Sequence, residues 1–222
     1  MILKRIFDII FALIILILIF PFCLPIIILL KLSGEGKVFY IQERVGKNKI
    51  PFSLFKFATM LQNSSNLPGG DVTTANDPRV LPMGKFLRKT KINELPQFIN
   101  ILIGDMSVIG PRPTTCKNYA YYSHEIQYEI RNVKPGITGI GSIVFRDEEN
   151  FLKHSKKDAV TCYKEDIAPF KGQLEVWYAK RQNFFLDISL IFITIVVVFN
   201  PKSKILTKIY TDLPKNQYFQ NN

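Results

Sequence analysis

An uncharged apolar run over residues 9–30 limits the architectures that are open to this chain. Its length is about that needed to cross the hydrocarbon core of a bilayer as a helix. Lys4 and Arg5 precede the run, and Lys31 follows it. Because basic residues favour the cytoplasmic side of a membrane, positive charge on both flanks is unusual for a simple span. The run therefore predicts a membrane element whose two ends lie on the same side.

Two prolines, Pro21 and Pro25, lie in the second half of this run. Proline inside a helix removes one backbone hydrogen bond and bends the helix axis. We expect a re-entrant membrane helix that enters, turns near the prolines and leaves on the side from which it came. A single span and a cleaved signal peptide are the alternatives, although no Ala-x-Ala cleavage site is present. Asp8, at the start of the segment, is expected to need a cationic partner such as Lys4 or Arg5.

The composition also indicates a membrane surface. The 222-residue chain has a formal net charge of +11 and is 47% hydrophobic. Basic and apolar character together favour anionic membrane lipids as partners. No basic run is combined with a nucleic-acid-binding motif, so nucleic acid is not expected as a partner. Its three cysteines are far apart and have no metal-binding spacing, which predicts reduced thiols.

Residues 88–113 hold the densest set of candidate chemical groups. We expect Asn93 to cap a short helix, with Glu94 and Pro96 in its first turn and Gly104 at its C-terminal end. Apolar residues at helical spacing in between predict one packed face. A proline on each side of Arg112 gives that side chain a defined direction, and its guanidinium matches a phosphate. An acid beside an anion-binding arginine indicates phosphoryl chemistry.

The same stretch resembles the bacterial sugar transferases, which are small monotopic phosphoglycosyl transferases. Their signature reads Asp-Glu-Leu-Pro-Gln, then Gly-Asp-Met-Ser, then Gly-Pro-Arg-Pro. Here it stands as Asn93-Glu94-Leu95-Pro96-Gln97, Gly104-Asp105-Met106-Ser107 and Gly110-Pro111-Arg112-Pro113. The resemblance extends over about residues 4–195, and a set of ordered motifs of this kind is highly specific. One departure stands out, because the nucleophilic Asp of the family is Asn93 in this chain.

The resemblance implies an enzyme that transfers a sugar 1-phosphate from a nucleotide diphosphate sugar to a polyprenyl (undecaprenyl) phosphate. It implies a covalent aspartyl-phosphosugar, release of the nucleoside monophosphate, and an acid pair that works with Mg²⁺. The expected location is the cytoplasmic face of the bacterial plasma membrane. The reaction would be the first membrane step of a surface glycan pathway, such as capsule or exopolysaccharide synthesis. Later glycosyltransferases of that pathway are further expected partners.

Asn93 leaves three alternatives open, because an amide is a poor nucleophile and a poor magnesium ligand. Glu94 is the nucleophile and metal ligand in the first, with Asn93 orienting it or the substrate. Asp105 supplies the missing carboxylate in the second. In the third, the chain is catalytically impaired and serves as a scaffold in a glycan-assembly complex. A lipid-binding protein of the membrane surface is a further competing function. We favour an active transferase, with Glu94, Asn93 and Asp105 as the candidate catalytic residues.

Five basic residues are candidates for binding substrate phosphate. Arg112 and Arg88 belong to the central stretch. Arg44, in Gln42-Glu43-Arg44-Val45-Gly46, and Lys134, in Lys134-Pro135-Gly136-Ile137-Thr138-Gly139, belong to segments that also resemble family motifs. Lys56 begins a segment that usually reads Lys-Phe-Arg-Thr-Met in the family, and Ala58 replaces the arginine here.

The order of elements predicts a mostly helical α+β fold. Short strands over 38–42 and 52–57 are expected to form a small hairpin. Helices are expected over 118–132, 158–163 and 174–181, with Pro169 and Gly172 separating the last two. The acidic residues within 145–149 are expected to be the solvated start of another helix.

The apolar segment 188–199 is short for a span, so we expect an amphipathic helix that lies in the membrane interface. A second span is the alternative. We expect three parts: a re-entrant anchor over residues 1–33, a cytosolic and interfacial sugar transferase domain over 34–200, and a polar C-terminal tail over 201–222.

Overall fold

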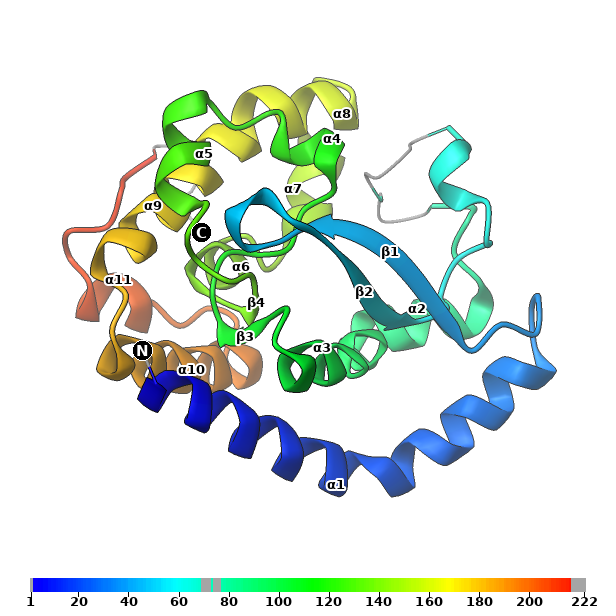
Figure 1. Ribbon diagram of the computed structural model, residues 1–222. Helices are drawn as coiled ribbons and strands as arrows, with labels where there is room; N and C mark the ends of the chain where they lie inside the picture. Colours follow the sequence, from blue (N-terminus) through cyan, green and yellow to red (C-terminus); the bar gives the residue numbers. More distant parts are fainter. Residues whose placement is uncertain (1, 69–72, 74–76, 217–222) are drawn as a thin grey trace.

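The computed structural model describes residues 2–68, 73 and 77–216. Helices predominate among them, and the strands form two separate two-stranded sheets (Figure 1). The predicted mostly helical α+β class is confirmed. Ser, Asn, Gly, Pro and Asp cluster over residues 64–78, which predicts a loop. That segment lies partly outside the described residues, as does the end of the predicted tail.

The elements follow one another along the chain with mostly short connections, the segment between β2 and α2 being the long exception. They are α1 (Ile2–Leu32), β1 (Phe39–Val45), β2 (Pro51–Phe57), α2 (Pro82–Lys89), α3 (Gln97–Ile103), β3 (Ser107–Ile109), α4 (Cys116–Tyr119), α5 (His124–Ile130), β4 (Gly136–Thr138), α6 (Ile140–Val144), α7 (Glu148–His154), α8 (Ala159–Cys162), α9 (Ala168–Arg181), α10 (Phe184–Phe199) and α11 (Ile205–Ile209). Short 3₁₀ turns cover η1 (Lys47–Lys49), η2 (Ser64–Asn66) and η3 (Ile92–Glu94), and η4 (Tyr163–Ile167) is a π-helical turn.

The N-terminal apolar run forms α1, a single helix of 31 residues. At 1.5 Å per residue it is about 46 Å long, which exceeds the hydrocarbon thickness of about 30 Å. Figure 1 shows α1 bent in its middle, with both ends beside the rest of the protein and the bend directed away from it. Pro21 and Pro25 lie inside the helix, so they do not divide it into two. By length and composition, α1 is able to cross a membrane.

Polar side chains attach the N-terminal end of α1 to the globular part. Lys4 is buried and forms an ion pair with Asp187 of α10. Asp8 accepts hydrogen bonds from the hydroxyl of Ser107 at 3.1 Å and from the next backbone N–H at 3.0 Å. Asp8 therefore has hydrogen-bond donors of β3 as its partners. Lys4, one of the two cations expected beside Asp8, pairs with Asp187 of α10 instead.

The predicted hairpin is confirmed. β1 and β2 are antiparallel, with Gln42 opposite Leu54. The second sheet was not predicted, because strands of three residues show too little alternation. It pairs β3 with β4 in parallel, with Ser107 opposite Gly136.

The second sheet joins two glycine-containing motifs backbone to backbone. A Cβ atom on Gly110 would lie 2.2 Å from the carbonyl oxygen of Lys134. A Cβ atom on Gly136 would lie 2.1 Å from the nitrogen of Gly110. No side chain fits at either position, so the glycines allow the segment with Arg112 to approach β4 closely.

Two predicted helix boundaries are wrong. The helix expected over 118–132 is divided into α4 and α5, because Ser123 accepts a hydrogen bond from Ile126 N–H and starts a new helix. The helices expected over 158–163 and 174–181 are continuous through η4 and α9. Pro169 lies in the first turn of α9, directly after the π turn, where its missing N–H disrupts the helix least.

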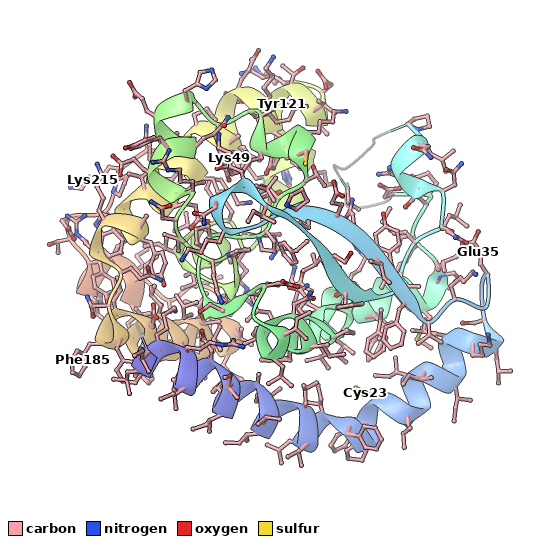
Figure 2. All side chains as sticks on the ribbon, viewed as in Figure 1. Cys23, Glu35, Lys49, Tyr121, Phe185 and Lys215 are labelled. Carbon is pink, nitrogen blue, oxygen red and sulfur yellow. The ribbon has the colours of Figure 1, made fainter. Side chains whose placement is uncertain are left out.

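The main core lies between α9, α10 and the β3–β4 sheet. Ile109, Ile140, Leu174 and Leu190 are each at most 1% exposed. α10 is longer than predicted, since it begins at Phe184 behind an Asn183 cap. Its outer face remains apolar and exposed, and Figure 2 shows Phe185 at the edge of the protein beside the N-terminal end of α1.

Candidate active site

A 3₁₀ turn, η3, carries the central acid. Lys91 immediately before it has φ 60°, in the left-handed region that non-glycine residues rarely adopt. Such strain is concentrated at functional sites. The next helix, α3, starts only at Gln97, so the prediction that Asn93 caps it is wrong. Gly104 ends α3 with φ 101°, as predicted.

Asn93 lies inside this turn with 5% of its surface exposed. Its side-chain oxygen Oδ1 is buried and has no hydrogen-bond partner within the described part of the chain. An unsatisfied buried acceptor costs about 1–3 kcal/mol. This oxygen is therefore an atom that a bound ligand or cation would stabilise.

Glu94 forms an ion pair with Arg112 across the site. Arg112 Nη2 donates a hydrogen bond to Glu94 Oε1 at 2.9 Å. Burial alone would raise the pKa of Glu94, but the charges of Arg112, Lys56 and Lys91 outweigh it and lower that pKa to about 2. Glu94 raises the pKa of Arg112 in turn. The pair is therefore fully ionised at neutral pH.

Further predicted phosphate-binding residues gather around this pair. Lys56 on β2 is half-buried, and its pKa is lowered to about 7, chiefly by desolvation. The charge of Glu94 opposes this shift, and the nearby cations Arg44, Arg112 and Arg88 contribute to it. The fold thus brings together four of the five predicted phosphate-binding residues beside the predicted acid.

The arginines also have contacts that hold them in place. Arg44 Nη1 donates a hydrogen bond to the carbonyl oxygen of Pro113 at 3.3 Å, which connects β1 to the segment after Arg112. Arg88 Nη1 lies 3.8 Å from the sulfur of Met60. Ala58, which replaces the family arginine, is 5% exposed and part of the core.

The buried carboxyl group of Glu175 contacts the backbone of Arg112. Glu175 Oε1 accepts a hydrogen bond from the backbone N–H of Arg112 at 3.3 Å. Glu175 is 1% exposed, and its other oxygen has no hydrogen-bond partner in the described residues. Burial raises the pKa of Glu175 to about 7, against the opposing effects of the Arg112 N–H and the charge of Lys171.

Sequence reasoning missed Lys171 and Glu175. Lys171 is 2% exposed, forms an ion pair with Glu148 at 2.6 Å and lies 5.8 Å from the ring centre of Tyr163. Glu148 does begin a helix, as predicted, but it is paired rather than simply solvated. Lys171, Glu175 and Tyr178 are spaced four and three residues apart on α9. That spacing could have indicated a polar stripe facing the interior.

Asp105 and Lys134 lie at the other end of α3. Asp105 follows the C-terminal end of the helix, where Asn100 Nδ2 is 3.5 Å from its Oδ2. Lys134 Nζ lies close to Gly104, 3.6 Å from where a Cβ atom would stand on that glycine. Burial, together with the charge of Arg5, lowers the pKa of Lys134. The seven residues of α3, about 10 Å of helix, separate this group from Glu94.

The residues present fit a magnesium ion only in combination with a phosphate substrate. No group of three or more His, Cys, Asp or Glu side chains converges in the residues that the structure describes. Glu94 supplies an ionised carboxylate, and the adjacent Asn93 has an unpaired amide oxygen. Mg²⁺ commonly uses one or two protein carboxylates, with phosphate and water oxygens as its remaining ligands. The carboxylate of Glu94 suits such a site, and the neutral amide oxygen of Asn93 adds a weaker donor.

The chain belongs to the bacterial sugar transferase family, which matches residues 1–201. It is 37% identical over 208 residues to UDP-glucose:undecaprenyl-phosphate glucose-1-phosphate transferase of Klebsiella pneumoniae, a match that covers 91% of this chain and 41% of that protein. It is 36% identical over 195 residues to UDP-N-acetylgalactosamine-undecaprenyl-phosphate N-acetylgalactosaminephosphotransferase of Aeromonas hydrophila, covering 86% and 42%.

A relative of similar size is an uncharacterized sugar transferase of Bacillus subtilis strain 168. It is 34% identical over 198 residues, which cover 88% of this chain and 86% of that protein. By contrast, the chain spans about two fifths of the length of the Klebsiella and Aeromonas relatives. The predicted membership of the bacterial sugar transferase family is confirmed.

Proposed function

We propose that this chain transfers a sugar 1-phosphate from a nucleotide diphosphate sugar to a polyprenyl phosphate. The observation that carries the proposal is the ionised Glu94–Arg112 pair within a cluster of cations. Both substrates are polyanions, and fixed cations stabilise the charge that develops as a phosphoryl group is transferred. The names of the Klebsiella and Aeromonas relatives support UDP-sugars and undecaprenyl phosphate as the substrate classes.

Glu94 is the nucleophile in this proposal. Its carboxylate attacks the phosphorus that carries the sugar, so a carboxyl–phosphate bond forms and the bond to the departing nucleoside monophosphate breaks. A phosphate oxygen of the polyprenyl phosphate then attacks the same phosphorus and releases Glu94 as a carboxylate. Arg112 exchanges its contact with Glu94 for one with the transferred phosphate. Bound Mg²⁺ would neutralise diphosphate charge, with the Glu94 carboxylate as its protein ligand and Asn93 Oδ1 as a weaker, neutral donor beside it. Asp105 lies too far along α3 for a direct part in these steps.

The membrane provides the second substrate in this proposal. We place the chain at the cytoplasmic face of the bacterial plasma membrane, with α1 as a re-entrant anchor that bends at Pro21 and Pro25. The position of both ends of α1 beside the globular part supports this arrangement (Figure 1). Arg5 donates hydrogen bonds to the carbonyl oxygens of Ile101 and Leu102 at 2.5 and 2.7 Å. The anchor is thereby attached to α3, the helix that follows Glu94.

The outer face of α10 lies in the membrane interface in the same arrangement. Phe192, Ile195 and Phe199 are all more than half exposed on that face. The product, a lipid-linked sugar, would be passed to later glycosyltransferases of a surface glycan pathway such as capsule or exopolysaccharide synthesis.

Asn93 supports a second candidate function, a catalytically impaired scaffold of a glycan-assembly complex. The test is to incubate the purified full chain with a panel of nucleotide diphosphate sugars, undecaprenyl phosphate and Mg²⁺, and to measure release of nucleoside monophosphate. The transferase proposal expects one of the sugar donors to release nucleoside monophosphate, at most one equivalent per protein without the lipid acceptor and many equivalents with it. No release from any donor, by a folded protein, would favour the scaffold.

A further inference from the structure

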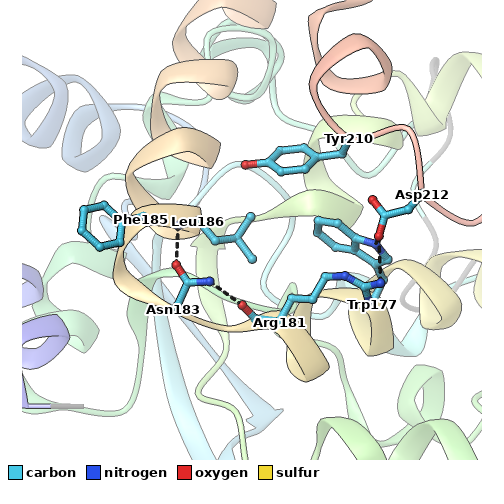
Figure 3. A pocket seen from close by; sticks show the side chains of 7 residues that line it. All are labelled: Trp177, Arg181, Asn183, Phe185, Leu186, Tyr210 and Asp212. Atoms are coloured by element: carbon cyan, nitrogen blue, oxygen red, sulfur yellow. Dashed lines mark hydrogen bonds and ion pairs between the residues drawn. The ribbon is translucent and has the colours of Figure 1, made fainter.

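A pocket that is separate from the Glu94 site lies where α9, α10 and the segment after α11 meet (Figure 3). Its volume of about 500 Å³ is in the range of small-molecule sites. The residues that line it are Trp177, Arg181, Asn183, Phe185, Leu186, Tyr210 and Asp212. None of these residues takes part in the proposed transfer.

One end of the pocket holds an anion-binding and a cation-binding group side by side. Arg181 Nη2 lies 2.7 Å from Asp212 Oδ2, and the two side chains are 47% and 51% exposed. Trp177 Nε1 donates a hydrogen bond to Asp212 at 3.0 Å. The guanidinium of Arg181 lies 5.0 Å from the ring centre of Trp177, and the ring of Tyr210 packs edge-on against Trp177 at 5.3 Å. The charged pair is thus accessible and backed by aromatic rings, as the dashed lines and sticks of Figure 3 show.

The charges of this pair select among ligands. A ligand with only a negative charge would bind Arg181 but would face the carboxylate of Asp212. A ligand with both charges can separate the pair and still leave each charge with a partner, which avoids the cost of an uncompensated charge. Charge complementarity therefore favours a zwitterion, even though the chain as a whole has a net charge of +11.

The other end of the pocket is apolar and continues onto the surface of α1 and α10. Phe185 is 83% exposed. Its neighbour Phe184 packs against Phe7 of α1, with ring centres 5.7 Å apart. Ile2 and Leu3 at the start of α1 are 80% and 60% exposed. A ligand with a charged head and a hydrocarbon tail would match both ends of this pocket.

We propose that the pocket binds a zwitterionic phospholipid whose headgroup has a primary ammonium, such as phosphatidylethanolamine. The phosphate contacts Arg181, the ammonium donates hydrogen bonds to Asp212, and the acyl chains extend over Phe185. A quaternary ammonium has no N–H to donate to Asp212, and an anionic headgroup leaves that carboxylate without a cation. The proposal requires contact with a membrane but does not depend on transfer activity.

Trp177 allows a direct test, because it is the only tryptophan of the chain. The full-length protein is reconstituted into phosphatidylcholine vesicles that contain an equal mole fraction of one acyl-brominated lipid: phosphatidylethanolamine, phosphatidylglycerol or phosphatidylcholine. Bromine quenches tryptophan fluorescence at short range, so the quenching of Trp177 reports the lipid that lies at the pocket. We expect brominated phosphatidylethanolamine to quench at least twofold more than either other lipid.

The variants Arg181→Gln and Asp212→Asn are expected to remove this preference while leaving quenching by brominated phosphatidylcholine in place. Lys180→Gln is the matched control, because Lys180 is the adjacent charge on α9 and pairs with Glu129 instead. The control is expected to keep the preference. Equal quenching by all three lipids would overturn the proposal, as would a preference that survives both variants.

Quenching by none of the lipids, with emission that changes as protein concentration rises, would also overturn it. That result would assign the pocket to a second copy of the chain. Absence of quenching at every protein concentration would count against membrane contact at this pocket. Neither result would affect the transfer proposal if nucleoside monophosphate is still released.

Discussion

Glu94 accepts a hydrogen bond from Arg112 at 2.9 Å, although 18 positions separate the two residues in the sequence. Arg112 is held from the other side, where its backbone N–H donates to the buried Glu175. The acid and the arginine at opposite ends of the signature thus meet at one point. This contact keeps Glu94 ionised and places the guanidinium where a phosphate would replace the carboxylate.

We expect the Glu94→Gln variant to lose transfer by at least about 10³-fold, the scale on which removal of a catalytic nucleophile acts. The amide keeps the shape but cannot attack phosphorus. Nucleoside monophosphate release measures the rate, and digestion with mass measurement should place a phosphosugar on Glu94 of the wild type. Glu125→Gln, at an exposed position of α5, serves as the control. Full activity of Glu94→Gln would show that another residue is the nucleophile.

We expect Asn93→Asp to lower the free energy of unfolding by about 1–3 kcal/mol without Mg²⁺, because an unpaired carboxylate replaces a buried amide. At a helix cap aspartate would replace asparagine at little cost, but Asn93 caps no helix. Added Mg²⁺ should restore part of the loss. Thermal unfolding measures both effects, with Asn150→Asp on exposed α7 as the control.

The activity of the same Asn93→Asp variant distinguishes the two functions. If the wild type is an impaired scaffold, the new carboxylate should create transfer where there was none. If Glu94 already acts as the nucleophile, the variant should only change an existing rate. A variant and a wild type that are both inactive with every donor would argue against a latent transferase site.

We expect Arg112→Lys to weaken binding of the nucleotide diphosphate sugar by about 10–100-fold, because lysine cannot form the two-pronged contact of a guanidinium. Calorimetric titration measures the affinity. Arg131→Lys is the control, since Arg131 stacks on Tyr128 with 3.9 Å to the ring centre. If Arg112 only supports the fold, its variant should lower the unfolding temperature without a separate loss of affinity in the folded protein.

Lys56 predicts a pH dependence of substrate binding. Its pKa of about 7 means that it is cationic below this pH and neutral above it, so nucleotide affinity should fall as pH rises through 7. The unfolded lysine keeps its proton up to about 10.5, so the Lys56 contribution to the free energy of unfolding should rise with pH between about 7 and 10.5. Lys56→Arg should remove the change in affinity near pH 7. An unaltered pH profile in that variant would assign the titration to another group.

The re-entrant form of α1 predicts that both of its ends face the cytosol. Single cysteines at Ile2 and Leu32, which are 80% and 81% exposed, can be introduced after the native cysteines are replaced. A membrane-impermeant maleimide should label both from the cytosolic side and neither from outside. Replacement of Pro21 and Pro25 by Ala should straighten the helix and favour labelling from opposite sides. Opposite-side labelling of the protein with its prolines intact would contradict re-entry.

Contiguous patterns were predicted well from the sequence. The apolar run of α1, the β1–β2 hairpin and the end of α3 at Gly104 all depend on neighbouring residues, so periodicity and backbone preference identify them. The family motifs also stand in contiguous segments. Prediction from the same local rules failed for Asn93, because the chain forms a 3₁₀ turn stabilised by tertiary packing before α3 begins.

The sequence by itself determined the long apolar helix, the kinds of chemical group present and the family, because each is encoded in residues that follow one another. Only the tertiary structure decided which groups meet. It brought Lys56, Arg44 and Arg88 to Glu94, left Asp105 and Lys134 at the far end of α3, and buried Glu175 behind Arg112. These contacts join segments far apart in the chain. The position of Arg112 also depends on the close backbone approach at Gly110 and Gly136, for which local periodicity contains no information.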